Sequence, residues 1–157
     1  MGKPVTRILI IYHSQSGNTK AMAEQVARGV ESIHGVKGDL KPAPEATLED
    51  LLTCDGLAIG SPEYFGAMAG RVKDFFDRTY EPARTDKRVF KKPYVVFISA
   101  GNDGRGSLSQ IERICLGYPL KKVYEPLIAR GVVTDSILRA CRELGKTIAA
   151  GCRAGIY

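Results

Sequence analysis

The sequence has few of the residues that build metal sites. It contains four cysteines and two histidines in 157 residues. No two cysteines form a C-x-x-C pair, and neither His13 nor His34 completes a zinc-ligand spacing with them. A structural metal is therefore not expected, and a chain of this length buries enough surface to be stable without one.

Long apolar runs are also missing. No stretch approaches the roughly 18 apolar residues of a membrane-spanning helix. No positively charged segment followed by an apolar stretch opens the chain, so nothing in it indicates a secretory signal. We therefore expect no membrane span, a cytoplasmic location and cysteines that stay reduced.

Several motifs of nucleotide and phosphate chemistry are absent. Neither G-x-x-x-x-G-K-[ST] nor G-x-G-x-x-G occurs, which excludes a P-loop and a dinucleotide-binding turn. No cysteine begins the C-x5-R motif that a low-molecular-weight tyrosine phosphatase needs. A receiver domain would need a carboxylate at the end of the third strand, where this chain has Gly60-Ser61-Pro62.

The composition is ordinary for a globular chain but its charge is basic. With 44% apolar and 25% charged residues, the sequence predicts one domain over residues 1–157. Lys and Arg number 23 against 17 Asp and Glu, which gives a formal net charge of +6. These cations are scattered, without interleaved aromatics, so no nucleic acid is expected. We interpret them as solvated faces, or alternatively as groups that attract the phosphates of NADPH or an acidic electron donor.

Short β-branched runs alternate with amphipathic stretches along the chain. Apolar residues at three- and four-residue steps, such as Met22, Val26 and Val30, predict helices between the runs. Strands are expected at 5–12, 36–41, 56–60, 94–99 and 123–129. Because such strands are joined by right-handed parallel crossovers, we expect an α/β three-layer sandwich. Its five-stranded parallel sheet should have the flavodoxin-like order 2-1-3-4-5.

Local signals mark the ends of some elements. Thr47 with Asp50 three residues later predicts the start of a short helix, and Ser107 with Gln110 resembles a capping box for a later one. Pro126 lies inside the fifth predicted strand, where it removes one backbone donor. That strand is therefore expected at an edge of the sheet.

Ligands of such sheets bind beyond the carboxyl ends of the strands. The first loop there carries three hydroxyls, on Ser14, Ser16 and Thr19, and backbone N–H groups at a helix start, which favour a phosphate. It has no lysine or arginine before Lys20, so a terminal monophosphate fits better than a pyrophosphate. A Ser-rich turn that only begins a helix is the alternative. The candidate binding loops are residues 13–19, 60–69 and 99–106.

The second and third loops complement the first. Tyr64 and Phe65 can pack on a flat heterocycle, or alternatively plug the end of the core. Three glycines, Gly101, Gly104 and Gly106, let backbone amides approach a ligand edge, although a plain Asp-Gly turn is the alternative. A phosphate cradle, an aromatic platform and a glycine edge at one end of one sheet together favour binding.

Two segments resemble a known family. Residues 14–19 resemble the S-x-S-G-N-T phosphate loop of flavodoxins. Residues 60–68 resemble the G-[ST]-P-x-[RY]-[FY]-G-x-M segment of flavodoxin-like NAD(P)H:quinone oxidoreductases of the tryptophan-repressor-binding-protein type. The resemblance implies FMN as cofactor, held by Ser14, Gln15, Ser16, Gly17, Asn18, Thr19, Pro62, Glu63, Tyr64, Phe65, Gly66, Ser99, Ala100, Gly101, Asn102 and Gly104.

The implied activity is electron transfer through FMN. NAD(P)H or a redox protein would donate electrons, and a small quinone-like molecule would accept them. A flavodoxin-type electron shuttle is the alternative, although such carriers are characteristically acidic and this chain is basic; a flavin-free binding module is a third possibility. No catalytic residue is assigned, because the cofactor performs the chemistry. The protein is expected to be a monomer or homodimer.

Glu63 is open to two interpretations at this level. A carboxylate near the flavin ring would disfavour the anionic reduced flavin and lower its potential. Alternatively, the carboxylate is solvated in its loop.

Overall fold

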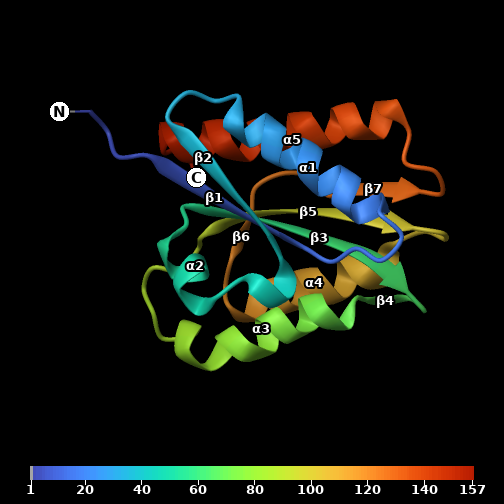
Figure 1. Cartoon of the computed structure of the whole chain (residues 1–157). Helices are drawn as coiled ribbons and strands as arrows, with labels where there is room; N and C mark the ends of the chain where they lie inside the picture. The colour runs from blue at the N-terminus through green and yellow to red at the C-terminus, as the bar shows by residue number, and fades with distance from the viewer. Residues whose placement is uncertain (1) are drawn as a thin grey trace.

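A parallel β-sheet runs through the middle of the computed structural model, which describes residues 2–157 (Figure 1). Its order is β2-β1-β3-β5-β6, with β7 also paired to β5, and all these pairs are parallel. The short β4 pairs antiparallel with β3. The strands are β1 (Thr6–Tyr12), β2 (Val36–Pro42), β3 (Gly56–Tyr64), β4 (Ala67–Met68), β5 (Pro93–Ala100), β6 (Lys121–Lys122) and β7 (Leu127–Arg130). The predicted order is confirmed, with β6 and β7 sharing the fifth position.

Helices cover both faces of the sheet, as the alternating pattern predicts. On one face lie α1 (Asn18–Glu31) and α5 (Asp135–Ala154); on the other lie α2 (Leu48–Thr53), α3 (Gly70–Ala83) and α4 (Arg105–Gly117) (Figure 1). A short 3-10 helix, Ala43–Glu45, joins β2 to α2. Two apolar clusters, one on each face, fill the space between helices and sheet, because β1, β3 and β5 are buried on both sides. Among residues 2–157, no helix combines the length and apolar character that crossing a membrane requires.

The predicted fifth strand, 123–129, is only partly correct. Val123 donates its N–H to the Tyr94 carbonyl at 3.2 Å, but ladder pairing stops there and resumes at Leu127. Pro126 has no N–H to donate, so the pairing is interrupted around this proline. The second piece, β7, runs beside β5 until Arg130 pairs with Ala100, which brings Arg130 to the carboxyl edge of the sheet.

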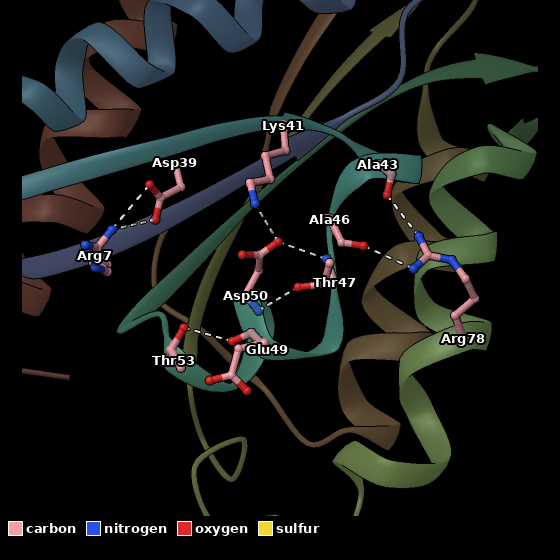
Figure 2. A network of polar contacts seen from close by, with 10 residues as sticks. All are labelled: Arg7, Asp39, Lys41, Ala43, Ala46, Thr47, Glu49, Asp50, Thr53 and Arg78. Atoms are coloured by element: carbon pink, nitrogen blue, oxygen red, sulfur yellow. Dashed lines mark hydrogen bonds and ion pairs between the residues drawn. The ribbon is translucent and has the colours of Figure 1, made fainter.

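The predicted start of α2 is confirmed. Asp50 donates its N–H to Thr47 Oγ1 at 3.1 Å, and Thr47 returns its N–H to Asp50 Oδ2 at 2.9 Å (Figure 2). Lys41 also binds this carboxylate, at 2.9 Å. Arg78 of α3 donates to the carbonyls of Ala43 and Ala46 at 3.0 Å each, which fastens the β2–α2 connection to α3.

The predicted capping box at Ser107 is wrong. Helix α4 begins at Arg105, after Gly104 at φ +71°, so Ser107 lies inside the helix. Ser107 Oγ instead donates to the Pro62 carbonyl of β3, and Gln110 Oε1 accepts from Met68 N–H of β4. These tertiary partners outweigh the local pattern, which by itself is indistinguishable from a capping box.

Helices α1 and α5 approach closely because glycines face the contact. A Cβ on Gly29 would lie 1.9 Å from the Arg142 carbonyl oxygen, and one on Gly145 would lie 2.0 Å from that of Val26. Backbone atoms occupy the space that a side chain would need. The packing of this face of the sheet therefore depends on both positions remaining glycine.

Gly145→Ala is expected to lower the free energy of unfolding by about 1–3 kcal/mol, because an added methyl group would overpack a backbone contact. Urea denaturation followed by circular dichroism measures this change. Gly117→Ala is the matched control, since a Cβ there, at the end of α4, meets no atom within 4 Å. Equal losses for the two variants would contradict the close approach of α1 and α5.

Candidate functional site

Three loops meet at the carboxyl edge of the sheet, after β1, β3 and β5. The end of the third strand, predicted at residue 60, is wrong: β3 stays paired with β5 to Pro62 and then forms a hairpin with β4. Pro62 stands opposite Ser99 in that register, and Glu63 and Tyr64 pair with Met68 and Ala67. The second loop is thus a β-hairpin whose tip is two residues long.

The first loop leaves donors free at the start of α1. Gly17, at φ +101°, is the N-cap residue, and no side chain accepts a hydrogen bond from the first turn in the part of the chain that is described. The first intrahelical bond runs from Ala21 N–H to the Gly17 carbonyl at 3.0 Å. Asn18, Thr19 and Lys20 therefore point N–H groups without helical partners toward the loop, in a turn that contains no acidic residue. This arrangement suits an anion.

A buried hydroxyl pair joins the first loop to the third. Thr19 Oγ1 and Ser99 Oγ are 2.7 Å apart, and both side chains are buried. Ser14 Oγ accepts from Gly17 N–H at 3.1 Å, which shapes the turn itself. The exposed side chains of this loop belong to Gln15, Ser16 and Asn18, so of the three predicted hydroxyls only that of Ser16 is both exposed and without a hydrogen bond here.

The hairpin tip displays one aromatic ring and half buries another. Phe65 at φ +52° and Gly66 at φ +75° form a two-residue turn with positive φ at both positions, as in a type I′ hairpin turn. The Phe65 side chain is fully exposed. Tyr64 is half-buried and meets the His13 ring edge to face, with the centroids 6.1 Å apart. The alternative prediction, that these two rings plug the end of the core, is therefore correct in part for Tyr64 and wrong for Phe65.

The carboxylate of Glu63 binds the start of α4. Oε1 accepts from Gly104 N–H at 3.2 Å, and Oε2 accepts from Gly106 N–H at 2.9 Å and from Ser107 N–H at 3.2 Å. The alternative of a solvated loop carboxylate is therefore wrong. The Gly104 N–H, predicted to edge the ligand, is taken by this contact. The sequence carries no local signal for this contact, because its pattern places the cap at Ser107, whereas in the structure the helix starts after Gly104 without a side-chain cap of its own.

Further contacts fix the hairpin against α4. Ser107 Oγ donates to the Pro62 carbonyl at 3.2 Å, and Met68 N–H donates to Gln110 Oε1 at 2.9 Å. A Cβ on Gly106 would lie 1.9 Å from the Gly66 carbonyl oxygen. The second and third loops therefore behave as one unit, and the predicted residues of both lie on it.

Cationic side chains surround the loops. Arg71 and Arg105 lie in the first turns of α3 and α4, and neither forms an ion pair within residues 2–157. Arg130 donates to the Asp103 carbonyl at 3.3 Å. Partial burial, and then the positive charge of Arg71, lower the pKa of His13, so its imidazole is neutral at pH 7.

Other chemical groups are distant or inert. Within residues 2–157, no three His, Cys, Asp or Glu side chains are grouped as a metal site would need. Burial raises the pKa of Cys54 to about 11, those of Cys141 and Cys152 to about 12, and that of Cys115 further still, so all four are protonated thiols at neutral pH.

A hollow of about 410 Å³ lies along the flanks of α3 and α4, lined by Met68, Gly70, Lys73, Gln110, Arg113 and Ile114. It shares Met68 with the second candidate loop, but its lining includes no residue of the first or third loop.

Comparisons with known proteins match most of the chain. Residues 6–118 match the family described as "NADPH-dependent FMN reductase". An NAD(P)H dehydrogenase (quinone) of Acidithiobacillus ferrooxidans is 35% identical over 160 aligned positions, which cover 89% of this chain and 75% of that protein. A flavodoxin of Aquifex aeolicus is 49% identical over 71 residues, or 45% of this chain but only 38% of that protein.

Solved structures share the fold over nearly the whole chain. A flavodoxin from the domain Archaea has a TM-score of 0.84 at 26% identity and covers 94% of this chain and 99% of its own. A flavodoxin, WrbA-like protein from Agrobacterium tumefaciens has a TM-score of 0.80 at 22% identity, with 95% and 98% covered. The second likeness concerns the fold alone.

Arg71→Gln is expected to raise the pKa of His13, because it removes one of the two causes that lower it. The value should stay below the ordinary 6.5, since burial remains. An NMR titration of the His13 ring protons measures this shift. Arg139→Gln, an exposed arginine on α5, should leave the titration of His13 unchanged; an equal effect of both variants would contradict a local interaction.

A pH dependence of stability follows from the same shift. The unfolded chain binds the His13 proton more readily than the folded chain does, so stability falls as the pH drops from about 6.5 through the lower pKa of the folded state. Thermal unfolding of the wild type and His13→Gln between pH 7 and pH 5 tests this. The variant should lose less stability over that range, and parallel curves would contradict the assignment.

Proposed function

The chain belongs to the NADPH-dependent FMN reductase family, and from that premise we propose that it binds FMN at the three loops and passes electrons from NAD(P)H to a quinone-like acceptor. The family match and the fold of the chain confirm the resemblance identified from residues 14–19 and 60–68. One observation carries the proposal for this chain: the free N–H donors of α1 open beside a hairpin and a glycine loop that are already bonded to one another.

The first loop fits a phosphomonoester. It offers the N–H groups of Asn18, Thr19 and Lys20 and the exposed hydroxyl of Ser16 at the positive end of a 14-residue helix. Gly17 carries no side chain there, and a Cβ on it would meet no atom within 4 Å, so the space above the turn is open. Because dipole and donors suffice for a dianion, no arginine is needed inside the loop.

The hairpin and the third loop fit the ring of a flavin. Tyr64 and Phe65 supply aromatic surface, and Gly101 and Asn102 are exposed at the tip of the third loop. When bound, FMN would supply the transfer of hydride and electrons. The protein's own residues would bind the phosphate, orient the ring and leave one face open to reactants, and no side chain is assigned as an acid or base.

The quinone-like acceptor and the nicotinamide donor are proposed from the relatives and the charge. The Acidithiobacillus relative is named for both NAD(P)H and quinone, and it covers most of this chain. Arg71 and Arg105 at the edge of the loops would attract the phosphates of NAD(P)H. A second candidate function, an electron shuttle between proteins, is favoured by the identity to the Aquifex flavodoxin and by the archaeal flavodoxin's fold.

The protein is expected to bind FMN with a micromolar or lower Kd by calorimetry, and riboflavin more weakly. Ser16→Asp should weaken FMN binding by about tenfold or more, because a carboxylate about 4 Å from a phosphate dianion costs about 2 kcal/mol even at the dielectric constant of water. The same change should spare riboflavin, which has no phosphate. Ser109→Asp, on the exposed face of α4, makes the same change away from the site and should have no effect. Absence of FMN uptake by the wild type would overturn the proposal.

Anaerobic mixing of the FMN-loaded protein with NADPH distinguishes the two candidate functions. A reductase is expected to lose its flavin absorbance directly, and to oxidise NAD(P)H steadily when a benzoquinone is added. A shuttle would lose its absorbance only with a separate reductase present, and that result would replace the proposed activity with the second one.

A further inference from the structure

The Glu63 carboxylate is fully engaged by backbone donors. Three N–H groups, those of Gly104, Gly106 and Ser107, converge on its two oxygens at 2.9–3.2 Å. Glu63 is the last residue but one of β3, and the three donors belong to the N-cap and first turn of α4. A carboxylate there is favoured by the helix dipole as well as by the hydrogen bonds.

This contact joins two segments that lie 41–44 positions apart in the sequence. Glu63 directly precedes Tyr64 and Phe65, while Gly104 lies two residues after Asn102 at the tip of the third loop. The other contacts between hairpin and α4, through Ser107 Oγ and Gln110, join uncharged groups. Glu63 is therefore the one charged side chain among the hydrogen bonds that join these two parts of the described structure.

The contact also decides which amides remain for a ligand. Because Gly104, Gly106 and Ser107 give their N–H groups to Glu63, and Arg105 gives its own to Asp103 Oδ1 at 3.0 Å, the start of α4 is already satisfied. Unlike α1, this helix has no free first turn to offer. Donors at the flavin edge are thus confined to the residues before Gly104.

We propose that Glu63 is a positioning residue for the flavin ring. By holding the hairpin against α4, it sets the separation between the aromatic tip and the Gly101-Asn102 edge before any flavin binds. This inference rests on the proposed function, because it concerns the same site. It differs from an electrostatic action on the ring, since both carboxylate oxygens are directed to backbone N–H groups.

The contact with α4 requires a carboxylate on a side chain as long as that of glutamate. A glutamine would keep one acceptor oxygen but turn an NH₂ group toward N–H donors, and an aspartate would be one methylene too short to reach α4. Gly106 is required for the same contact, since a Cβ there would push against the Gly66 carbonyl. E63Q, E63D and G106A should therefore weaken the same unit in different ways.

The first test uses the protein without flavin. In E63Q, amide hydrogen exchange is expected to speed up by about tenfold or more either at Gly104 or at Gly106 and Ser107, because the single amide oxygen can replace only one of the two carboxylate oxygens. E125Q, which changes an exposed glutamate in the loop before β7, is the matched control and should leave all three amides unchanged. Unchanged exchange at all three amides in E63Q would contradict the hydrogen bonds from α4 to the Glu63 carboxylate.

The second test measures FMN and riboflavin binding by calorimetry, well below the unfolding temperature. E63Q should weaken both ligands by a similar factor of about tenfold, unlike S16D, which acts on FMN alone. A lower Tm with unchanged Kd for both flavins would mean a structural role only and would overturn the inference. If E63Q does not fold, E63D and G106A are measured by the same criterion.

These results separate the inference from the proposed function. A wild-type protein that binds neither flavin overturns the function, and with it the role of Glu63 toward the ring. A wild type that binds FMN while E63Q binds it equally well overturns only the positioning role.

Discussion

The parallel direction of β1, β3 and β5 places their carboxyl ends, and the three loops that follow, at one edge of the sheet. Each pair of loops is then joined: His13 N–H donates to the Gly60 carbonyl, Thr19 meets Ser99, and Glu63 binds α4. Segments far apart in the sequence become one surface through these bonds. Binding there needs little rearrangement, because the connections exist in the protein alone.

Much of the fold could be predicted from the sequence because its signals are local. The β-branched runs of β1, β3 and β5 and the Thr47 capping box are each decided by neighbouring residues. The hairpin after β3 and the start of α4 could not be predicted, since they depend on contacts more than 40 positions apart. Ser107 shows why: its local pattern fits a cap, but the Pro62 carbonyl is its actual partner.

The loop residues were predicted by type and place, but not by partner. Ser16 and Gly17 lie where the motif indicates, at an open helix start. Thr19 and Ser99 are committed to each other beneath it, because two buried hydroxyls must find partners and satisfy one another at this spacing. A motif therefore fixes the position of a group more reliably than the atom to which that group bonds.

The hairpin turn at Phe65 and Gly66 has a consequence for engineering. Type I′ turns prefer Asn-Gly, and a bulky residue at positive φ costs stability, yet here a fully exposed aromatic residue occupies that corner. Since the ring contributes no packing, replacing it would relieve the backbone without opening a void. A substitution at this one position would therefore change the stability of the turn and the surface offered to a bound molecule together.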